Sequence, residues 1–505
     1  MASSGPKNFL AFDLGATSGR AILGRLDSGL IKLEELHRFS NDPVTYNGEM
    51  HWDAPRLWFE MRRALDIARR QAERIDSIGV DTWGVDYALL GEGGSLIENP
   101  WHYRDPRTDG MVEEVTGKVT AERIYDQTGI QFMALNTLYQ LYAASRRTPN
   151  LLYNAEFLVT MPDLLNYWLT GVVSCEYTIA STTQFLDWRT RGWACDLLQK
   201  LDIPTHLLAP IIPPGTEIGR LRTDLGSAHD LAFTTVIAPA CHDTGSAVAA
   251  VEAGIAGGRK TAFLSSGTWS LLGTEVGAAV VTDQARRLNF TNEGGVGNTI
   301  RLLKNITGMW LLEGCRAAWA QAGEPSAREP YTYPQLLEAA AEAPSLKRWI
   351  NPDAPAFVRP SDMTRAIRNF CRQTDQPEPE TPGDFTRTVI ESLALKYRFE
   401  LEQLESLTGT KFDEVRVIGG GSQNAMLNQC TADATGKRVV AGPSEATALG
   451  NIVMQMVGRG AVESIAEGRE IVSRSFPPTT FLPKPKPGWE TAYEDFSHYC
   501  RTTAQ

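Results

Sequence analysis

The composition of this 505-residue chain is that of a globular protein, with 42% hydrophobic and 22% charged residues. Its length predicts two or three domains, and two large lobes are favoured. The net charge of −11 disfavours a nucleic-acid partner. There is no signal-peptide pattern and no apolar run of the roughly 20 residues that span a membrane, so we expect a cytoplasmic protein without a membrane partner. Seven scattered cysteines without a Cys-x-x-Cys pair indicate reduced thiols, and the histidine spacing disfavours structural zinc.

The first predicted element is a hairpin over residues 9–24, "FLAFDLGATSGRAILG". A turn of Gly, Ala, Thr and Ser can point several backbone N–H groups at a phosphate, and no lysine is needed. Thr17 and Ser18 add hydroxyls, Arg20 adds a guanidinium, and Asp13 could hold Mg²⁺. Taken alone, a plain hairpin is the favoured interpretation, because small residues dominate turns. A Walker loop is excluded, since no Gly-Lys-Ser/Thr occurs.

The next stretch of interest is "GVDTWGVDYALL", in which Trp83 and Gly84 end a predicted strand and Asp86 follows. An aromatic face beside polar groups suits a sugar, whose C–H face stacks while its hydroxyls form hydrogen bonds. A buried core tryptophan in a hairpin explains the pattern about equally well.

Further along, "APACHDTGSAV" places Asp243 between a predicted strand and a helix of small residues. A carboxylate there lies where ligands bind in α/β folds, and it could take a proton from a substrate hydroxyl, with His242 and Thr244 beside it. The alternative is a helix N-cap, which aspartate favours. From this pattern alone, the cap is preferred.

The stretch "FLSSGTWSLLG", residues 263–273, repeats the plan of the first hairpin about half a chain later, with Thr268 in its turn. Strand-like runs alternate with helical patterns throughout, which indicates an α/β fold. Together these features predict two related lobes, residues 1–253 and 254–505.

A long helix is predicted over residues 384–409, where apolar residues recur on one face and Gly409 supplies the stop. It is followed by "VIGGGSQN", in which Gly419, Gly420 and Gly421 separate a strand from a helix. Three glycines are unfavourable without a reason, so a backbone contact with a flat ligand is favoured over a flexible turn.

In number and order these stretches resemble the FGGY carbohydrate kinase family. Others that carry the resemblance are "YRDPRTDG", "GIQFMALNTLYQL", "EYTIASTTQ", "NEGG" and "LLKNITGMWLL". The resemblance covers nearly the whole chain. It implies two ribonuclease-H-like lobes of the actin/Hsp70 superfamily around a deep cleft, with the sugar mainly on the first lobe and ATP mainly on the second.

The resemblance also implies roles for individual residues. The phosphate loops would be formed by Ala16, Thr17, Ser18, Gly19 and Arg20 and by Thr268, and the adenosine contact by Gly419, Gly420 and Gly421. Sugar contacts would come from Gly84, His242, Thr244 and Asn305, with Asp243 as general base. In "GMWLLEGCR", Glu313 departs from the family pattern, because it stands where members can carry a nucleotide-contacting glutamine.

The implied reaction is ATP-dependent phosphorylation of a ketose with Mg²⁺ present. The stretches "DTWGVD" and "HDTGSAV" favour L-rhamnulose, giving L-rhamnulose 1-phosphate in rhamnose catabolism. Another ketose such as L-fuculose or xylulose is the first alternative, and a non-kinase ATPase of the same fold is the second. A monomer or a homodimer is expected.

Overall fold

The computed structural model describes residues 6–225, 233–255, 258–324, 330–358, 360–484 and 487–502. The chain forms two compact units. The first contains residues 1–252, 275–302 and 445–477, and the second contains residues 253–274, 303–444 and 478–505. The two units therefore do not correspond to the predicted division of the chain after residue 253, because residues 275–302 and 445–477 pack with the first unit. Within the described residues no helix is long and apolar enough to cross a membrane. All seven cysteines are free thiols.

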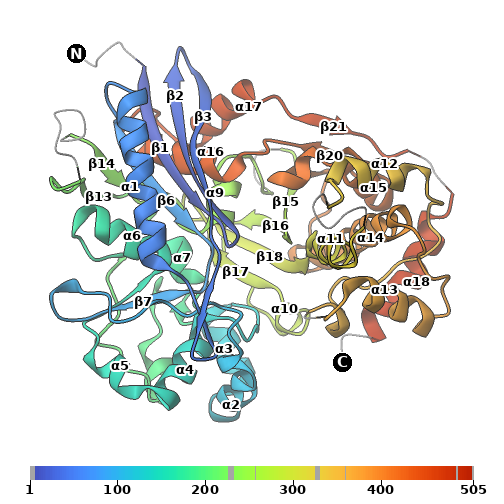
Figure 1. Ribbon diagram of the computed structural model, residues 1–505, viewed down its shortest axis with the longest axis horizontal. Coiled ribbons are helices and arrows are strands. Elements are labelled where there is room, and N and C mark those ends of the chain that lie inside the picture. The colour runs from blue at the N-terminus through green and yellow to red at the C-terminus, as the bar shows by residue number, and fades with distance from the viewer. Residues whose placement is uncertain are drawn as a thin grey trace. The chain divides into compact units, whose positions relative to one another are not determined.

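The first unit is built on a six-stranded sheet in the order β13-β14-β6-β1-β2-β3 (Figure 1). Strands β1 (Lys7–Leu14), β2 (Ser18–Asp27) and β3 (Leu30–Ser40) are antiparallel. Strands β6 (Ser77–Thr82) and β14 (Thr235–Ile237) run parallel to β1, and β13 (Glu217–Arg220) is an antiparallel edge. The hairpin predicted over residues 9–24 is the β1–β2 pair.

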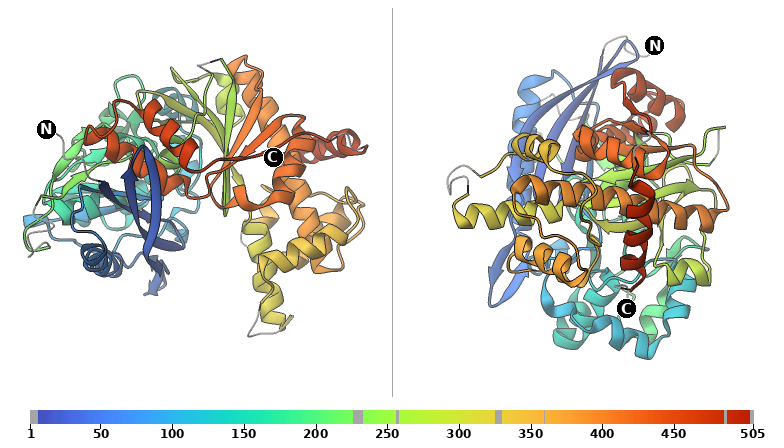
Figure 2. Two further views of the ribbon diagram at one scale, coloured as in Figure 1. Left: turned by 90° about the horizontal axis from the view of Figure 1, so that it is seen from above. Right: turned by 90° about the vertical axis from the view of Figure 1, so that its right-hand side faces the viewer.

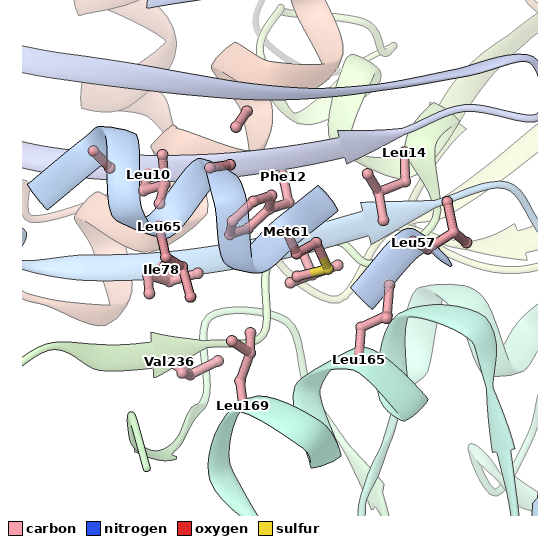
Figure 3. Close-up of a cluster of buried hydrophobic side chains, with 14 of the residues drawn as sticks. Leu10, Phe12, Leu14, Leu57, Met61, Leu65, Ile78, Leu165, Leu169 and Val236 are labelled. Carbon is pink, nitrogen blue, oxygen red and sulfur yellow. The ribbon is translucent and has the colours of Figure 1, made fainter. Parts of the chain in front are cut away.

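One face of this sheet is covered by α1 (Ala54–Gln71) and α6 (Met161–Thr170). Helix α1 begins at Asp53, whose side chain accepts a hydrogen bond from the backbone N–H of Arg56. Figure 3 shows Leu57, Met61 and Leu65 of α1 beside Phe12 and its neighbours on the sheet. These apolar residues recur every three or four positions, so α1 buries one continuous face.

The other face is covered by α16 (Ala446–Gly458) and α9 (Asp243–Ala249), and α17 (Ile465–Ser475) packs on α16 and β3. The two helices approach closely because Gly450 has no side chain: a Cβ there would lie 2.6 Å from the carbonyl carbon of Ser246. This packing explains why a segment near the end of the chain belongs to the first unit.

The remaining helices and strands of the first unit form an insertion between β6 and β14 and several short connections. They are β4 (Val44–Tyr46), β5 (Glu49–His51), β7 (Tyr87–Leu90), α2 (Met111–Lys118), α3 (Ala121–Thr128), α4 (Thr137–Arg147), α5 (Pro149–Asn154), β8 (Phe157–Thr160), β9 (Cys175–Glu176), α7 (Tyr177–Ser181), β10 (Leu186–Asp187), β11 (Gly192–Trp193), α8 (Cys195–Lys200), β12 (Ile211–Ile212), α10 (Asp283–Arg287) and β17 (Thr291–Gly294).

The second unit contains strands in the order β18-β16-β15-β19-β20-β21, except that residues 300–302 of β18 belong to the first unit. Their bounds are β15 (Thr261–Ser266), β16 (Trp269–Val276), β18 (Ile300–Thr307), β19 (Glu414–Ile418), β20 (Arg438–Ala441) and β21 (Thr479–Phe481). In Figure 2 the strands near residues 263 and 416, β15 and β19, lie side by side, although they are far apart in the sequence. The helices are α11 (Trp310–Ala322), α12 (Tyr333–Glu342), α13 (Met363–Gln373), α14 (Pro382–Thr408), α15 (Ala425–Thr435) and α18 (Trp489–Thr502).

Helix α14 confirms the long helix predicted over residues 384–409. It begins with a capping box between Thr381 and Asp384, and Gly409 ends it in the left-handed conformation.

The two sheets share one strand order around their hairpins. The order β3-β2-β1-β6-β14 in the first corresponds to β18-β16-β15-β19-β20 in the second, and each has an added antiparallel edge strand, β13 or β21. Both hairpins are followed across the sheet by two parallel strands. The α/β fold with two ribonuclease-H-like lobes is thereby confirmed, and the repeated Gly/Ser/Thr turn marks the same place in each lobe.

Candidate functional site

Three aspartates gather at the carboxyl ends of neighbouring strands in the first unit. Asp13 on β1 pairs in register with Asp81 on β6. Thr82, the last residue of β6, forms a parallel bridge with His242, which brings Asp243 to the same edge. Residues paired in register on parallel strands point to the same side of the sheet. This edge therefore carries the first unit's candidate catalytic groups.

Two of these carboxylates are buried and have specific partners. Asp13 forms an ion pair with Arg20, which also pairs with Glu445. Burial raises the pKa of Asp13, although Arg20 opposes the shift. Asp81 is fully buried; its Oδ2 accepts a hydrogen bond of 2.6 Å from Asn451, while its Oδ1 has no partner among the described residues. Burial raises the pKa of Asp81 well above its usual value, and the nearby Asp13 adds to the shift.

The hairpin turn between β1 and β2 is closed by a hydrogen bond of 2.9 Å from the Gly15 N–H to the Ser18 carbonyl. Thr17 at its tip is exposed and Ala16 is half-buried. In the part of the chain that the structure describes, the N–H groups of Ala16 and Thr17 donate to no protein acceptor. Gly19 has a packing reason, because a Cβ there would lie 2.8 Å from Leu14 and overlap Phe39. The turn can thus offer backbone donors to an anion.

Asp243 is the first residue of α9, and the N-cap position belongs to His242, which makes no side-chain capping bond. The N-cap interpretation of Asp243 is therefore wrong by one residue. The Asp243 side chain is 32% exposed, and its Oδ1 lies 3.4 Å from His242 Nε2. Thr244 donates its hydroxyl to the same Oδ1 at 3.0 Å. The structure thus brings His242, Asp243 and Thr244 together around a carboxylate that solvent can reach.

The far side of the His242 ring meets a buried ion pair. Nδ1 lies 3.3 Å from Glu293 on β17 and 3.2 Å from Arg301 on β18, and these two residues pair at 3.2 Å. Burial raises the pKa of Glu293, but the charge of Arg301 opposes this, and the net shift is downward. His242 is therefore fixed from both sides of its ring.

Gly84 lies against the other edge of His242. A Cβ at Gly84 would lie 3.3 Å from His242 Nε2 and 3.3 Å from Thr182. The next residue, Val85, has a φ of 68°, an unfavourable conformation for a β-branched side chain. Its backbone is held by Thr182, which accepts a hydrogen bond from the Val85 N–H, and by Thr137, which donates to the Val85 carbonyl. Strain of this kind is concentrated at functional sites.

Trp83 and Asp86 form the centre of an aromatic cluster. Asp86 is 1% exposed, and burial raises its pKa to about 6. Its Oδ2 accepts hydrogen bonds from the Trp52 and Trp83 indoles and from the Tyr103 N–H, while its Oδ1 accepts one from Gln140. The Trp52 and Trp83 rings are 4.0 Å apart. Both carboxylate oxygens of Asp86 therefore accept hydrogen bonds from the protein itself, and these bonds orient the two indoles.

The second unit brings its own predicted residues together. The turn between β15 and β16 is closed by Gly267 and has the exposed Thr268 at its tip. β15 and β19 are parallel, so the turn adjoins Gly419–Gly421. Gly419 has a φ of 77°, and a Cβ at Gly421 would overlap the Ser266 side chain. Nothing lies within 4 Å of a Cβ at Gly420.

Two further candidate residues of this unit, Asn305 and Glu313, lie close to each other in the sequence. The start of α11 lies beside the turn, because the Thr268 carbonyl accepts hydrogen bonds from the N–H groups of Gly308 and Trp310. Glu313, in the first turn of α11, is engaged by Arg316 at 2.8 Å and by the Tyr333 hydroxyl at 2.7 Å. Asn305 lies on β18 and is half-buried.

The sequence reasoning did not select Asp81, Glu293 or Arg301. "DTWGVD" contains Asp81, but its importance depends on strand pairing with Asp13. Glu293 was visible only as part of "NEGG", and Arg301 as a charge in an apolar strand. A charged residue inside an apolar run is the one signal that could have identified Arg301.

The two sheets with this strand order form the two-lobed fold of solved sugar kinases. The structure matches gluconate kinase from Lactobacillus acidophilus (TM-score 0.78, 18% identity, covering 99% of each chain). It matches Plasmodium falciparum glycerol kinase with ADP equally well (TM-score 0.78, 15% identity, covering 99% of each chain).

Residues 8–250 match the N-terminal domain, and residues 262–459 the C-terminal domain, of the FGGY family of carbohydrate kinases. The chain therefore belongs to the FGGY family of carbohydrate kinases. Its curated relatives include a rhamnulokinase from Bacteroides thetaiotaomicron, 44% identical over 98% of this chain and 100% of the relative. The rhamnulokinase of Bacillus subtilis is 38% identical over 94% and 95% of the two chains. The protein is thus an enzyme that phosphorylates a sugar with ATP as co-substrate.

Proposed function

We propose that the enzyme phosphorylates L-rhamnulose with ATP, giving L-rhamnulose 1-phosphate and ADP. The observation that carries this proposal is the 44% identity to a rhamnulokinase over 98% of the chain. The geometry supports it, because an accessible carboxylate lies beside a fixed histidine and a strained turn at one sheet edge.

Asp243 is proposed as the general base. A sugar hydroxyl is a weak acid, so its proton must leave as its oxygen bonds to the γ-phosphorus. In this step the proton passes to Asp243, the bond from the γ-phosphorus to the β,γ-bridging oxygen breaks, and ADP leaves. Asp243 suits this role because its side chain is partly exposed and no cation within the described part of the chain forms an ion pair with it other than the neighbouring His242. Asp13, by comparison, is paired with Arg20.

The sugar is proposed to lie against Trp83, Gly84, His242, Thr244 and Asn305. The absence of a side chain at Gly84 lets a ligand reach the His242 edge, and Thr244 presents its hydroxyl beside the base. Asp86 contributes indirectly, since its carboxylate holds the Trp83 indole rather than facing a ligand. An aromatic face fixed in this way suits the C–H face of a sugar.

The phosphates of ATP are proposed to bind backbone donors of each hairpin: Ala16–Gly19 with Arg20 in the first unit, and Thr268 in the second. Gly419, Gly420 and Gly421 would contact the adenosine, because Gly420 presents bare, exposed backbone. The first unit is thus proposed to serve mainly the sugar, and the second mainly the nucleotide. Glu313 already has two partners, so a nucleotide contact there would have to compete with Arg316 and Tyr333.

Mg²⁺ fits the residues of the first unit. Within the described residues no three His, Cys, Asp or Glu side chains converge as a metal cage. Mg²⁺ does not need one, since it binds one or two carboxylates together with substrate phosphates. Asp13 would hold it, and the unpartnered Asp81 Oδ1 is a further buried oxygen at the same edge. The ion would supply charge neutralisation on the phosphates.

The test measures ADP release with L-rhamnulose, L-fuculose and xylulose. The highest kcat/KM is expected with L-rhamnulose. A preference for another ketose would select the first alternative, and an ATPase rate that no ketose changes would select the second. Gel filtration with light scattering distinguishes monomer from homodimer, and the cytoplasmic location stays a prediction.

The assignment of the base is tested separately with Asp243→Asn. The variant should bind both substrates, while kcat falls by about 10²- to 10⁴-fold. Asp126→Asn, which changes an exposed carboxylate paired with Arg189, is the matched control and should keep its kcat. Near-normal turnover by Asp243→Asn would remove Asp243 from the role of base.

A further inference from the structure

Two buried charged side chains, Arg301 and Glu293, meet at one nitrogen of the His242 ring. Arg301 Nη2 lies 3.2 Å and Glu293 Oε2 lies 3.3 Å from Nδ1, and the two charged groups are 3.2 Å from each other. Arg301 is 0% and Glu293 is 6% exposed. A fully buried arginine is rare unless it is paired, so its position needs an explanation.

The partners of Arg301 determine which nitrogen of His242 carries the proton. The Arg301 Nε donates to the Gly294 carbonyl at 2.9 Å, which fixes the guanidinium in the plane of that bond. A guanidinium only donates hydrogen bonds, so Nη2 can approach Nδ1 closely only if Nδ1 accepts. A neutral imidazole that accepts at Nδ1 must carry its proton on Nε2.

Glu293 has a different part in this arrangement. Among the described residues, its Oε2 has no partner at hydrogen-bond distance and angle, but it lies 3.2 Å from Arg301 Nη2 and forms an ion pair with it. It therefore neutralises the guanidinium charge, without which burial of Arg301 would be unfavourable. In the alternative arrangement, Nδ1 carries the proton and donates a hydrogen bond to Glu293. Nε2 would then have no proton, and the Arg301 N–H groups would face another donor.

We propose that Arg301, neutralised by Glu293, fixes His242 in the tautomer protonated at Nε2, so that the ring is a hydrogen-bond donor toward Asp243 and the sugar. Nε2 lies 3.4 Å from Asp243 Oδ1 and faces the space above Gly84. Arg301 and Glu293 are positioning residues, since they act through His242. The consequence for catalysis rests on the proposed function, whereas the tautomer does not.

This tautomer divides the chemistry between two neighbouring side chains. A ring that already carries a proton on Nε2 cannot take one from the sugar hydroxyl, so proton removal is left to Asp243. The one Nε2–H can donate to Asp243 Oδ1, 3.4 Å away, or to an oxygen of the bound sugar. A sugar oxygen at that place would take over the donor from Asp243 and leave the carboxylate free to accept the hydroxyl proton, which gives the site a means of discrimination.

The tautomer is tested directly with ¹⁵N-histidine-labelled protein at neutral pH. Nitrogen shifts and two-bond couplings distinguish a protonated from a bare ring nitrogen, and His242→Gln identifies the signals. In the unmodified protein we expect a protonated Nε2 and a bare Nδ1. A proton on Nδ1, alone or together with Nε2, would overturn the proposal, and this measurement requires no sugar.

Variants then separate the two buried partners. Arg301→Met should move the ring proton to Nδ1, because Nδ1–H can then donate a hydrogen bond to Glu293. Glu293→Gln should leave the proton on Nε2. An unchanged ring in Arg301→Met, or a changed one in Glu293→Gln, would contradict the assigned roles. If a single variant fails to fold, the charge-balanced Glu293→Gln/Arg301→Met pair takes its place, and it should lose the fixed Nε2–H tautomer.

The kinetic arm uses the double variant Glu293→Gln/Arg301→Met. Its kcat/KM for L-rhamnulose should fall about 10- to 100-fold, as is typical when a partner that orients a functional group is lost, while KM for ATP stays unchanged. Glu275→Gln/Arg469→Met removes another buried pair of the same unit, 2.8 Å apart, and should preserve both values. Loss in the control as well would mean that any buried pair has this effect. If L-rhamnulose is not the substrate, the spectra still decide the tautomer.

Discussion

The glycine turn of the second unit offers a sharp test, because adjacent glycines are predicted to matter for different reasons. At Gly421 an added Cβ would overlap the Ser266 side chain and lie 3.1 Å from the Ser266 carbonyl oxygen. At Gly420 an added Cβ would meet nothing within 4 Å. Gly421 is therefore required by packing, whereas Gly420 is free to contact a ligand.

The magnitudes follow from these surroundings. Overpacking costs about 1–3 kcal/mol, so Gly421→Ala should destabilise the protein by that amount. Gly420→Ala should leave stability unchanged or raise it by about 0.4–1 kcal/mol, since alanine restricts the unfolded chain. If Gly420 lies against adenosine, as proposed, the same variant should raise KM for ATP while KM for the sugar stays constant.

Urea unfolding and initial-rate kinetics measure both effects. Replacing Ser266 with glycine removes the atoms that Gly421→Ala would overlap, so the double variant should recover most of the lost stability, as a double-mutant cycle reports. The packing argument is refuted if Gly421→Ala is as stable as the parent, or if Gly420→Ala is equally destabilised. An unchanged KM for ATP in Gly420→Ala would refute the nucleotide contact.

Three further predictions concern the first unit. Burial raises the pKa of Asp163 from 3.8 to about 7, so the folded state binds the proton more tightly, and stability should fall as pH rises from about 4 to 7 by up to roughly 4 kcal/mol. Asp163→Asn should flatten this slope in urea unfolding, and an unaltered slope would contradict it. Val85→Gly removes the strain of a positive φ at a β-branched residue, so the free energy of unfolding should stay the same or rise by about 1 kcal/mol. At the same time kcat should fall, because the turn at Gly84 becomes more flexible. A loss of more than about 1 kcal/mol of stability would show that no strain was present. Gly450→Ala should cost more than about 3 kcal/mol, because its Cβ would overlap the Ser246 backbone between α9 and α16, and a stable, active variant would refute this packing.

The local parts of the site could be predicted from the sequence. Both Gly/Ser/Thr hairpins and the glycine turn were found there, because turn residues and apolar strands are short-range signals. The helix ending at Gly409 was predicted for the same reason. Asp243 was found at the right place but one residue away from its expected helix position, since the end of a helix is poorly defined by local pattern.

The parts that depend on tertiary packing could not be predicted. Asp81 acquires its significance from register with Asp13, and Arg301 from a histidine about sixty positions earlier in the chain. The return of residues 445–477 to the first unit likewise depends on the fit between Gly450 and Ser246. Nothing in the composition of α16 shows which sheet it covers.

The shared strand order of the two sheets allows the residues beside their hairpins to be compared position by position. In the first sheet the positions beside the hairpin hold Asp13, paired across the strands with Arg20 and Asp81. The corresponding positions of the second sheet hold Ser265, Leu271 and Ile418. The first hairpin thus carries ionisable groups at positions where the second carries neutral ones. To make the second sheet bind a proton at this place, three residues would have to be changed together, because a lone carboxylate at the half-buried position 265 would lack a counter-ion.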